Sequence, residues 1–122
     1  MNKLILKIGD IDVEAELAEN SVALAIQDVL PISARCQKWG KEIYFPIPVD
    51  MANEGGQEVV KLGDVAYWPP GKALCLFFGP TPASHGDEPR AASAVTVVGK
   101  ISGDLSPLAS VQSGTRIVIT KN

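Results

Sequence analysis

The sequence predicts an all-β domain, and three observations indicate this class. Apolar and polar residues alternate with a period of two over several short segments, as they do in half-buried strands. The 11 glycines and 9 prolines fall in clusters between these segments, where tight turns are expected. Only residues 21–30 have the spacing of an amphipathic helix. About eight short strands with such spacing predict either a sandwich or a closed barrel.

The chain begins with a predicted hairpin formed by residues 3–8 and 11–18 around a Gly-Asp turn. In its first strand we assign Leu4 and Leu6 to one face, and Ile5 and Ile8 to the other. The polar face of the second strand carries three carboxylates, Asp12, Glu14 and Glu16. Three carboxylates on one face can recruit a cation, but exposed strand faces are normally charged, so a solvated face is expected.

The predicted helix at residues 21–30 has an apolar stripe and clear limits. Its stripe is formed by Val22, Ile26 and Val29. Asn20 or Ser21 can cap its start, and Pro31 prevents its continuation. Because it is a single helix among strands, we expect it to cover one open end of a barrel.

The rest of the chain alternates strands with turns and loops. Further strands are predicted at residues 32–39, 42–47, 59–62, 65–68, 72–78, 95–101 and 115–120. Gly40 and Lys41 form a predicted two-residue hairpin turn. The Pro-Pro-Gly sequence ending at Gly71 predicts a type II turn in which that glycine takes the positive φ. Residues 50–57 and 79–94 are expected to be loops, and residues 105–110 a short helical turn.

Size, charge and cysteine content limit the class of protein. A length of 122 residues predicts one domain, residues 1–122. The net charge of −3 argues against nucleic acid or an anionic membrane as a partner. No apolar segment is long enough to span a bilayer. Cys36 and Cys75 can pair, but their apolar surroundings favour buried, reduced thiols, which predicts a cytoplasmic protein.

Two stretches of the sequence carry a family resemblance. Residues 63–82 contain Tyr-Trp-Pro-Pro-Gly followed by a run of apolar residues, and residues 39–45 read Trp-Gly-Lys-Glu-Ile-Tyr-Phe. With the early hairpin and the helix, they resemble a family of small uncharacterised prokaryotic proteins with a cyclophilin-like fold. The resemblance implies a closed eight-stranded barrel with one capping helix. The family has no agreed substrate, so the resemblance implies no activity. We expect no cofactor.

True cyclophilins are peptidyl-prolyl isomerases that use an arginine on a barrel strand to polarise the substrate amide. If the Pro-Pro-Gly turn here matches the Gly-Pro-Gly turn of cyclophilins, the arginine strand corresponds to residues 42–47. That stretch contains no arginine, and a pocket without its central cation loses the electrostatic part of the rate gain. We therefore expect no isomerase activity. A divergent prolyl isomerase is the alternative function, and a structural domain acting through homo-oligomerisation is the second alternative.

Other catalytic chemistry finds little support in the sequence. A metal centre of the cupin type needs several imidazoles, and the chain has one histidine, His85. Ser84 precedes it directly, so their side chains diverge, and a nucleophile elbow is absent. We expect His85 to be exposed in a loop, and we assign no catalytic residue and no metal ligand.

A binding groove is expected beside the predicted strand at residues 72–78. One face of this strand, with Leu74 and Leu76, is predicted to be nearly fully buried in the core, as is Val97. The other face is either covered by loops or lines a groove for a peptide or small molecule. The candidate binding residues are Arg35, Glu42, Tyr44, Tyr67, Phe77 and Phe78. The aromatic residues among them can equally serve only in packing.

Arg35 is the one cation among these candidates. If the hairpin around residues 39–42 pairs in simple register, Arg35 lies opposite Glu42 or Tyr44. It then either supplies a charge to the groove or forms a cross-strand ion pair, and the ion pair is the expected arrangement.

Overall fold

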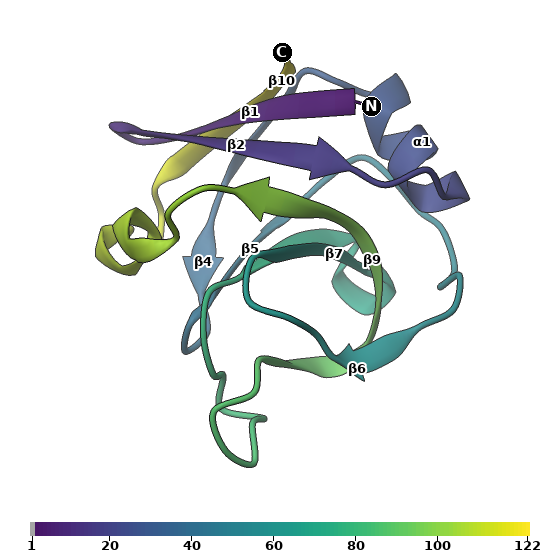
Figure 1. Ribbon diagram of the computed structural model, residues 1–122. Helices are drawn as coiled ribbons and strands as arrows, with labels where there is room; N and C mark the ends of the chain where they lie inside the picture. Colours follow the sequence, from purple (N-terminus) through teal and green to yellow (C-terminus); the bar gives the residue numbers. More distant parts are fainter. Residues whose placement is uncertain (1) are drawn as a thin grey trace.

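The computed structural model describes residues 2–122, and its strands confirm the all-β class (Figure 1). The strands are β1 (Asn2–Ile8), β2 (Ile11–Leu17), β3 (Ile32–Arg35), β4 (Gln37–Lys38), β5 (Glu42–Pro46), β6 (Gln57–Val59), β7 (Asp64–Trp68), β8 (Ala73–Phe77), β9 (Arg90–Ser102) and β10 (Arg116–Lys121). One α-helix, α1 (Ser21–Asp28), and two short 3-10 turns, η1 (Pro69–Gly71) and η2 (Ser106–Ser110), complete the described elements.

The strands form one curled antiparallel sheet. Its order is β3-β10-β1-β2-β9-β7-β8-β5-β4, and β6 pairs with β9 beside this path. The two ends of the path, β3 and β4, are separated along the chain by Cys36 alone. Hydrogen bonding between the strands of residues 2–122 does not run continuously around the sheet. A closed barrel of eight strands therefore stays a prediction.

The predicted hairpin is confirmed, with β1 and β2 paired from Asn2 opposite Leu17 to Ile8 opposite Ile11. The assignment of Ile8 to the outer face is wrong, because β1 is regular and every second residue from Leu4 points inward. Ile8 is only 1% exposed and packs in the core. The acidic face of β2 is largely solvated, as expected.

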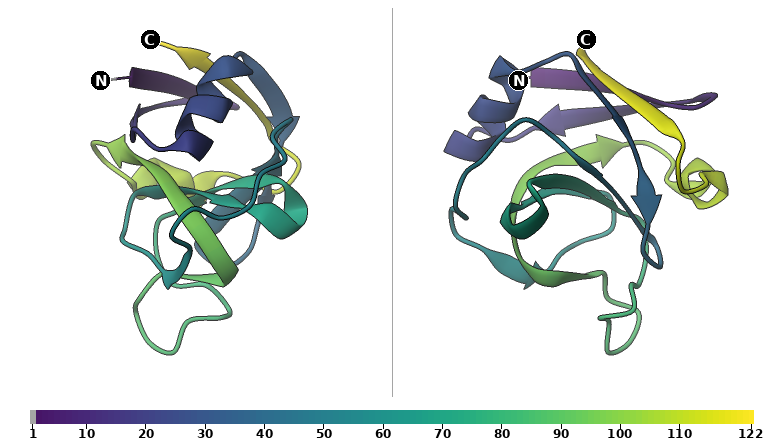
Figure 2. Two further views of the ribbon diagram at one scale, coloured as in Figure 1. Left: turned by 90° about the vertical axis from the view of Figure 1, so that its right-hand side faces the viewer. Right: turned by 180° about the vertical axis from the view of Figure 1, so that it is seen from behind.

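The helix is confirmed and lies beside the β1–β2 hairpin at one end of the sheet (Figures 1 and 2). Asn20 caps it, because its side-chain oxygen accepts a hydrogen bond of 2.8 Å from the amide of Ala23. Its buried residues are Val22, Ala23 and Ile26. The helix ends at Asp28, two residues before the predicted end at residue 30. Pro31 disfavours the helical conformation at the residue before it, so the helix stops short of the proline.

The two predicted turns have different outcomes. Gly40 has a φ of 60°, and Trp39 and Glu42 exchange backbone hydrogen bonds across it, so the hairpin turn is confirmed. The type II turn at Gly71 is wrong. The Pro-Pro-Gly segment forms η1, and Lys72 takes the left-handed conformation with a φ of 48°. Gly71 is required for another reason: a Cβ there would lie 2.7 Å from the ring of Trp68.

The core forms two clusters, one on each side of β7 and β8. Leu74 and Leu76 are fully buried in the larger cluster, as predicted. The burial predicted for Val97 is wrong: Val97 is half-buried, and its neighbour Val98 is the fully buried residue. The cause is an irregularity in the β7–β9 pairing, where one step along β7 corresponds to two residues of β9.

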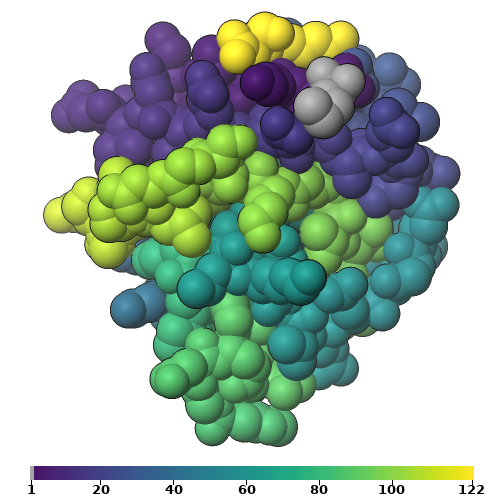
Figure 3. Space-filling model, viewed as in Figure 1, coloured from purple at the N-terminus to yellow at the C-terminus, as the bar shows by residue number. Residues whose placement is uncertain are grey.

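Strand β9 is much longer than predicted. It begins at Arg90 instead of residue 95. Its first part pairs with β6, and its later part pairs with β7 on one side and β2 on the other. The segment that precedes β9, around residues 79–89, projects from the body of the protein at the bottom of the view (Figure 3). The first part of β9 therefore covers the outer face of β7 and β8, where the second cluster lies.

Candidate functional site

A pocket of about 270 Å³ opens over the second cluster, between the outer face of the sheet and the first part of β9. Its lining consists of Trp39, Glu42, Tyr44, Trp68, Cys75, Ala91, Ala92 and Val95. Three of these side chains are aromatic and three are aliphatic. Among the residues that the structure assigns to this lining, Glu42 is the only acid, and none is a lysine, arginine or histidine.

Local pairing places the floor of the pocket. Glu42 and Tyr44 are two residues apart on β5 and therefore share a face. Tyr44 lies opposite Cys75 of β8, which brings the thiol to the same face. The two-residue turn at Gly40 returns Trp39 to the side of Glu42.

The walls of the pocket come from β7 and β9. Trp68 ends β7, where its ring packs on Gly71 and its indole N–H donates a hydrogen bond of 2.7 Å to Ser93 Oγ. This bond ties the tryptophan to β9. Ala91 and Val95 are buried on β9, whereas Ala92 is exposed and lies at the mouth. Small residues on β9 thus leave the space that the pocket occupies.

Glu42 is the polar centre of the site. Its side chain is 5% exposed, and its Oε1 atom has no hydrogen-bond partner among the described residues. Burial raises the pKa of this carboxyl to about 7, and the neighbouring Cys75 thiol opposes the rise only in part. A buried polar atom without a partner is uncommon and costs free energy. The carboxyl therefore has an unused capacity for a hydrogen bond.

Cys75 is a poor nucleophile in this environment. Burial raises its pKa well above the usual value for a thiol, and the negative charge of Glu42 raises it further. The thiolate is the reactive form of cysteine, so the thiol stays protonated and inert near neutral pH. Both Cys36 and Cys75 are free and buried, as the sequence predicted.

Of the six predicted binding residues, the structure brings only Glu42 and Tyr44 to the pocket. Phe77 is fully buried in the second cluster without lining the space. Tyr67 belongs to the main core, where its hydroxyl donates a hydrogen bond of 2.6 Å to the carbonyl of Val49. The ring of Phe78 lies outside the lining, with the ammonium of Lys38 5.9 Å from its centroid.

The expected position of Arg35 is wrong. Gln37 lies opposite Tyr44, while Arg35 pairs with Arg116 of β10. Its guanidinium is exposed and donates to the carbonyl of Gly114 at 2.9 Å. The register set by the two-residue turn is kept between β4 and β5, and it places Gln37 rather than Arg35 opposite Tyr44. Arg35 lies before the break at Cys36, in β3, which pairs with β10. Arg35 therefore forms no ion pair with Glu42.

Sequence reasoning missed the other lining residues for two reasons. Trp68 and Cys75 were visible in strand patterns, but only the pairing of β8 with β5 and with β7 shows that they face the same space. Ala91 and Ala92 fell in the predicted loop at residues 79–94, and Val95 was the first residue of the strand predicted after it. No local signal in that stretch, which is rich in alanine and serine, indicated a strand.

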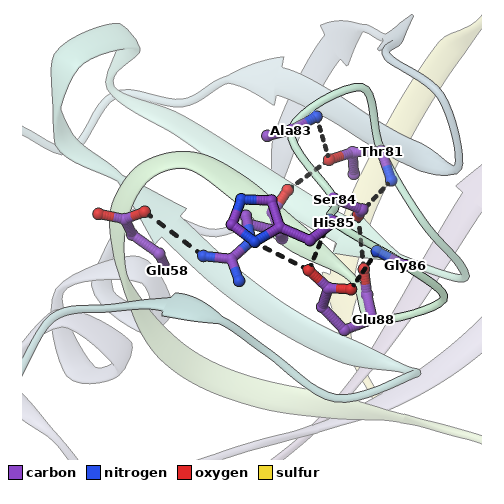
Figure 4. Close-up of polar contacts among 8 residues, drawn as sticks. Glu58, Thr81, Ala83, Ser84, His85, Gly86 and Glu88 are labelled. Carbon is purple, nitrogen blue, oxygen red and sulfur yellow. Dashed lines mark hydrogen bonds and ion pairs between the residues drawn. The ribbon is translucent and has the colours of Figure 1, made fainter.

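The segment around His85 is held by its own hydrogen bonds (Figure 4). The Glu88 carboxylate accepts hydrogen bonds of 2.8 Å from the backbone amides of His85 and Gly86, and one of 3.1 Å from Arg90. The His85 amide and then Arg90 lower the pKa of Glu88 to about 2. His85 itself is exposed, as predicted. The segment is thus a loop that its own hydrogen bonds hold in place.

The described residues contain neither a cluster of metal-ligating side chains nor a membrane-spanning helix. Across residues 2–122, His, Cys, Asp and Glu side chains form no group of three that could hold a metal ion. Within the same residues, no helix has the length and apolar character needed to cross a bilayer.

Comparisons with known proteins agree with this fold. A family model described as cyclophilin-like matches residues 2–120. The chain is also similar to the solution structure of a hypothetical protein from Archaeoglobus fulgidus, with 42% identity and a TM-score of 0.85. That match covers 99% of this chain and 95% of the archaeal one. No curated protein matches the sequence.

Proposed function

The chain belongs to the cyclophilin-like family, and we propose that it is a non-catalytic binding protein whose pocket takes a small, largely apolar ligand or the side chain of a peptide. One observation carries the proposal. Glu42, a buried residue whose Oε1 atom has no hydrogen-bond partner among the described residues, lines a space formed otherwise by aromatic and aliphatic side chains and a protonated thiol. Apolar walls with a few placed polar groups are typical of ligand sites.

The energetics of the pocket support occupation by a ligand. Aromatic side chains supply large contact areas to bound molecules. When its carboxyl is ionised, Glu42 gains a further hydrogen bond only if a ligand brings a donor, because the described residues leave Oε1 unpaired. A molecule with a compact apolar body and one donor group therefore fits both features.

Tryptophan fluorescence tests this proposal directly, since both tryptophans of the chain, Trp39 and Trp68, line the pocket. We expect benzyl alcohol to change their emission in a saturable way. Ala92→Phe at the mouth should block the space and abolish saturation. Ala109→Phe, which enlarges an exposed alanine outside the lining, should leave the titration unchanged. Equal titrations of the wild type and Ala92→Phe would exclude binding in this pocket.

We also propose that the protein lacks prolyl isomerase activity. The described lining of the pocket contributes a carboxyl and no cation, and Arg35 lies on β3, outside that lining. In a coupled assay with a prolyl peptide, we expect the wild type to match the uncatalysed rate at micromolar concentrations. Turnover by the wild type that disappears in a folded Arg35→Ala variant would instead support the divergent isomerase.

A cytoplasmic location is part of the same proposal. Both cysteines are free and buried, which suits a reducing compartment. The negative net charge continues to argue against nucleic acid as a partner.

A further inference from the structure

The side chains that line the pocket restrict the charge and the hydrogen-bonding groups of the ligand as well as its size. A purely apolar ligand would cover Glu42 and leave Oε1 without a partner. An anion would be repelled by the carboxylate, because the two negative charges would lie close together in a desolvated site. A neutral donor would satisfy the hydrogen bond but would leave the negative charge buried whenever the carboxyl is ionised.

An organic ammonium meets all of these requirements. It donates a hydrogen bond to the Glu42 carboxylate, neutralises its charge, and is attracted by aromatic rings, of which Trp39, Tyr44 and Trp68 line the space. Resting on the binding function proposed above, we propose that the natural ligand carries a protonated amine on a compact apolar group, and that its ammonium pairs with Glu42.

The surroundings of Glu42 leave the position opposite its carboxyl open to a cation. On its own strand, Tyr44 is the other titratable residue of the lining. From β8 comes the Cys75 thiol, which stays protonated. The parts of β7 and β9 that line the pocket bring Trp68 and apolar side chains. Lys41, next in the chain to Glu42, is exposed and its stem packs against Gly79. Arg90 is held by Glu88 and Glu58.

The protonation of the Glu42 carboxyl makes the affinity for an ammonium ligand depend on pH. Because the pKa of Glu42 is raised to about 7 in the empty pocket, an ammonium must bind the ionised fraction, which is about a tenth at pH 6 and about nine tenths at pH 8. The affinity for an amine that remains protonated should therefore rise about tenfold between these pH values. The affinity for a neutral ligand should change little.

The test compares benzylamine with benzyl alcohol, which have the same ring and differ in charge. At pH 8 we expect benzylamine to bind the wild type at least about tenfold more tightly than benzyl alcohol does. At pH 6 this difference in affinity should shrink. In Glu42→Gln, verified as folded by circular dichroism, the advantage and its pH dependence should both disappear. Glu19→Gln, which neutralises an exposed carboxylate outside the pocket, should retain both.

The outcomes separate the inference from the function on which it rests. Saturable binding of benzyl alcohol with no preference for benzylamine would overturn the ammonium inference and leave the binding function intact. Binding of neither probe would overturn both. A capped lysine derivative distinguishes the sources of the ammonium: if it binds as benzylamine does, the ligand is a side chain of a peptide, and if only benzylamine binds, it is a free amine.

Discussion

The wild-type protein should lose about 2–3 kcal/mol of unfolding free energy between pH 5 and pH 8, and Glu42→Gln should not. The pKa of this carboxyl is raised from 4.5 to about 7 in the folded state. The unfolded chain therefore releases this proton at lower pH than the folded protein does. The stabilising contribution is fully present below about pH 4.5, falls as pH rises, and is lost once pH passes about 7.

Urea denaturation at both pH values measures this effect, with Glu19→Gln as a matched control at an exposed site. Other shifted groups act outside the window. The pKa values of Glu88 and Asp104 are lowered, so these groups affect stability in more acidic solution. The raised pKa of Cys75 moves its effect to alkaline pH. Equal losses in the wild type and in Glu42→Gln would show that Glu42 is not the source.

Leu76→Ala should lower the unfolding free energy by about 2–5 kcal/mol, because the truncation leaves a cavity in the main core. Leu76 is fully buried in the middle of β8, where it lies opposite Ile43 on one side and Val65 on the other. Leu62→Ala removes the same atoms from a side chain that is 54% exposed and should cost much less. Chemical denaturation compares the two variants. A loss below about 1 kcal/mol for Leu76→Ala would indicate that the core around β8 repacks.

The sequence by itself determined the features that depend on neighbours along the chain. The β1–β2 hairpin follows from alternation on both sides of a two-residue turn. The helix follows from its apolar stripe, its Asn20 cap and the proline beyond its end. The hairpin at Gly40 follows from the need for a positive φ. In each case the energies that decide the structure act within a few residues. The family resemblance, which rests chiefly on residues 39–45 and 63–82, was confirmed.

Only the tertiary structure decided which residues meet across the sheet. The irregular register between β7 and β9 replaced Val97 by Val98 in the core. The break at Cys36 pairs Arg35 with β10, while Gln37 and Lys38 pair with β5. The first part of β9, with no strand signal of its own, is ordered by pairing with β6, and it supplies the wall that turns a face of β8 into a pocket. Each outcome depends on pairing between segments far apart in the chain, and a shift of one residue in such a pairing moves a side chain to the opposite face.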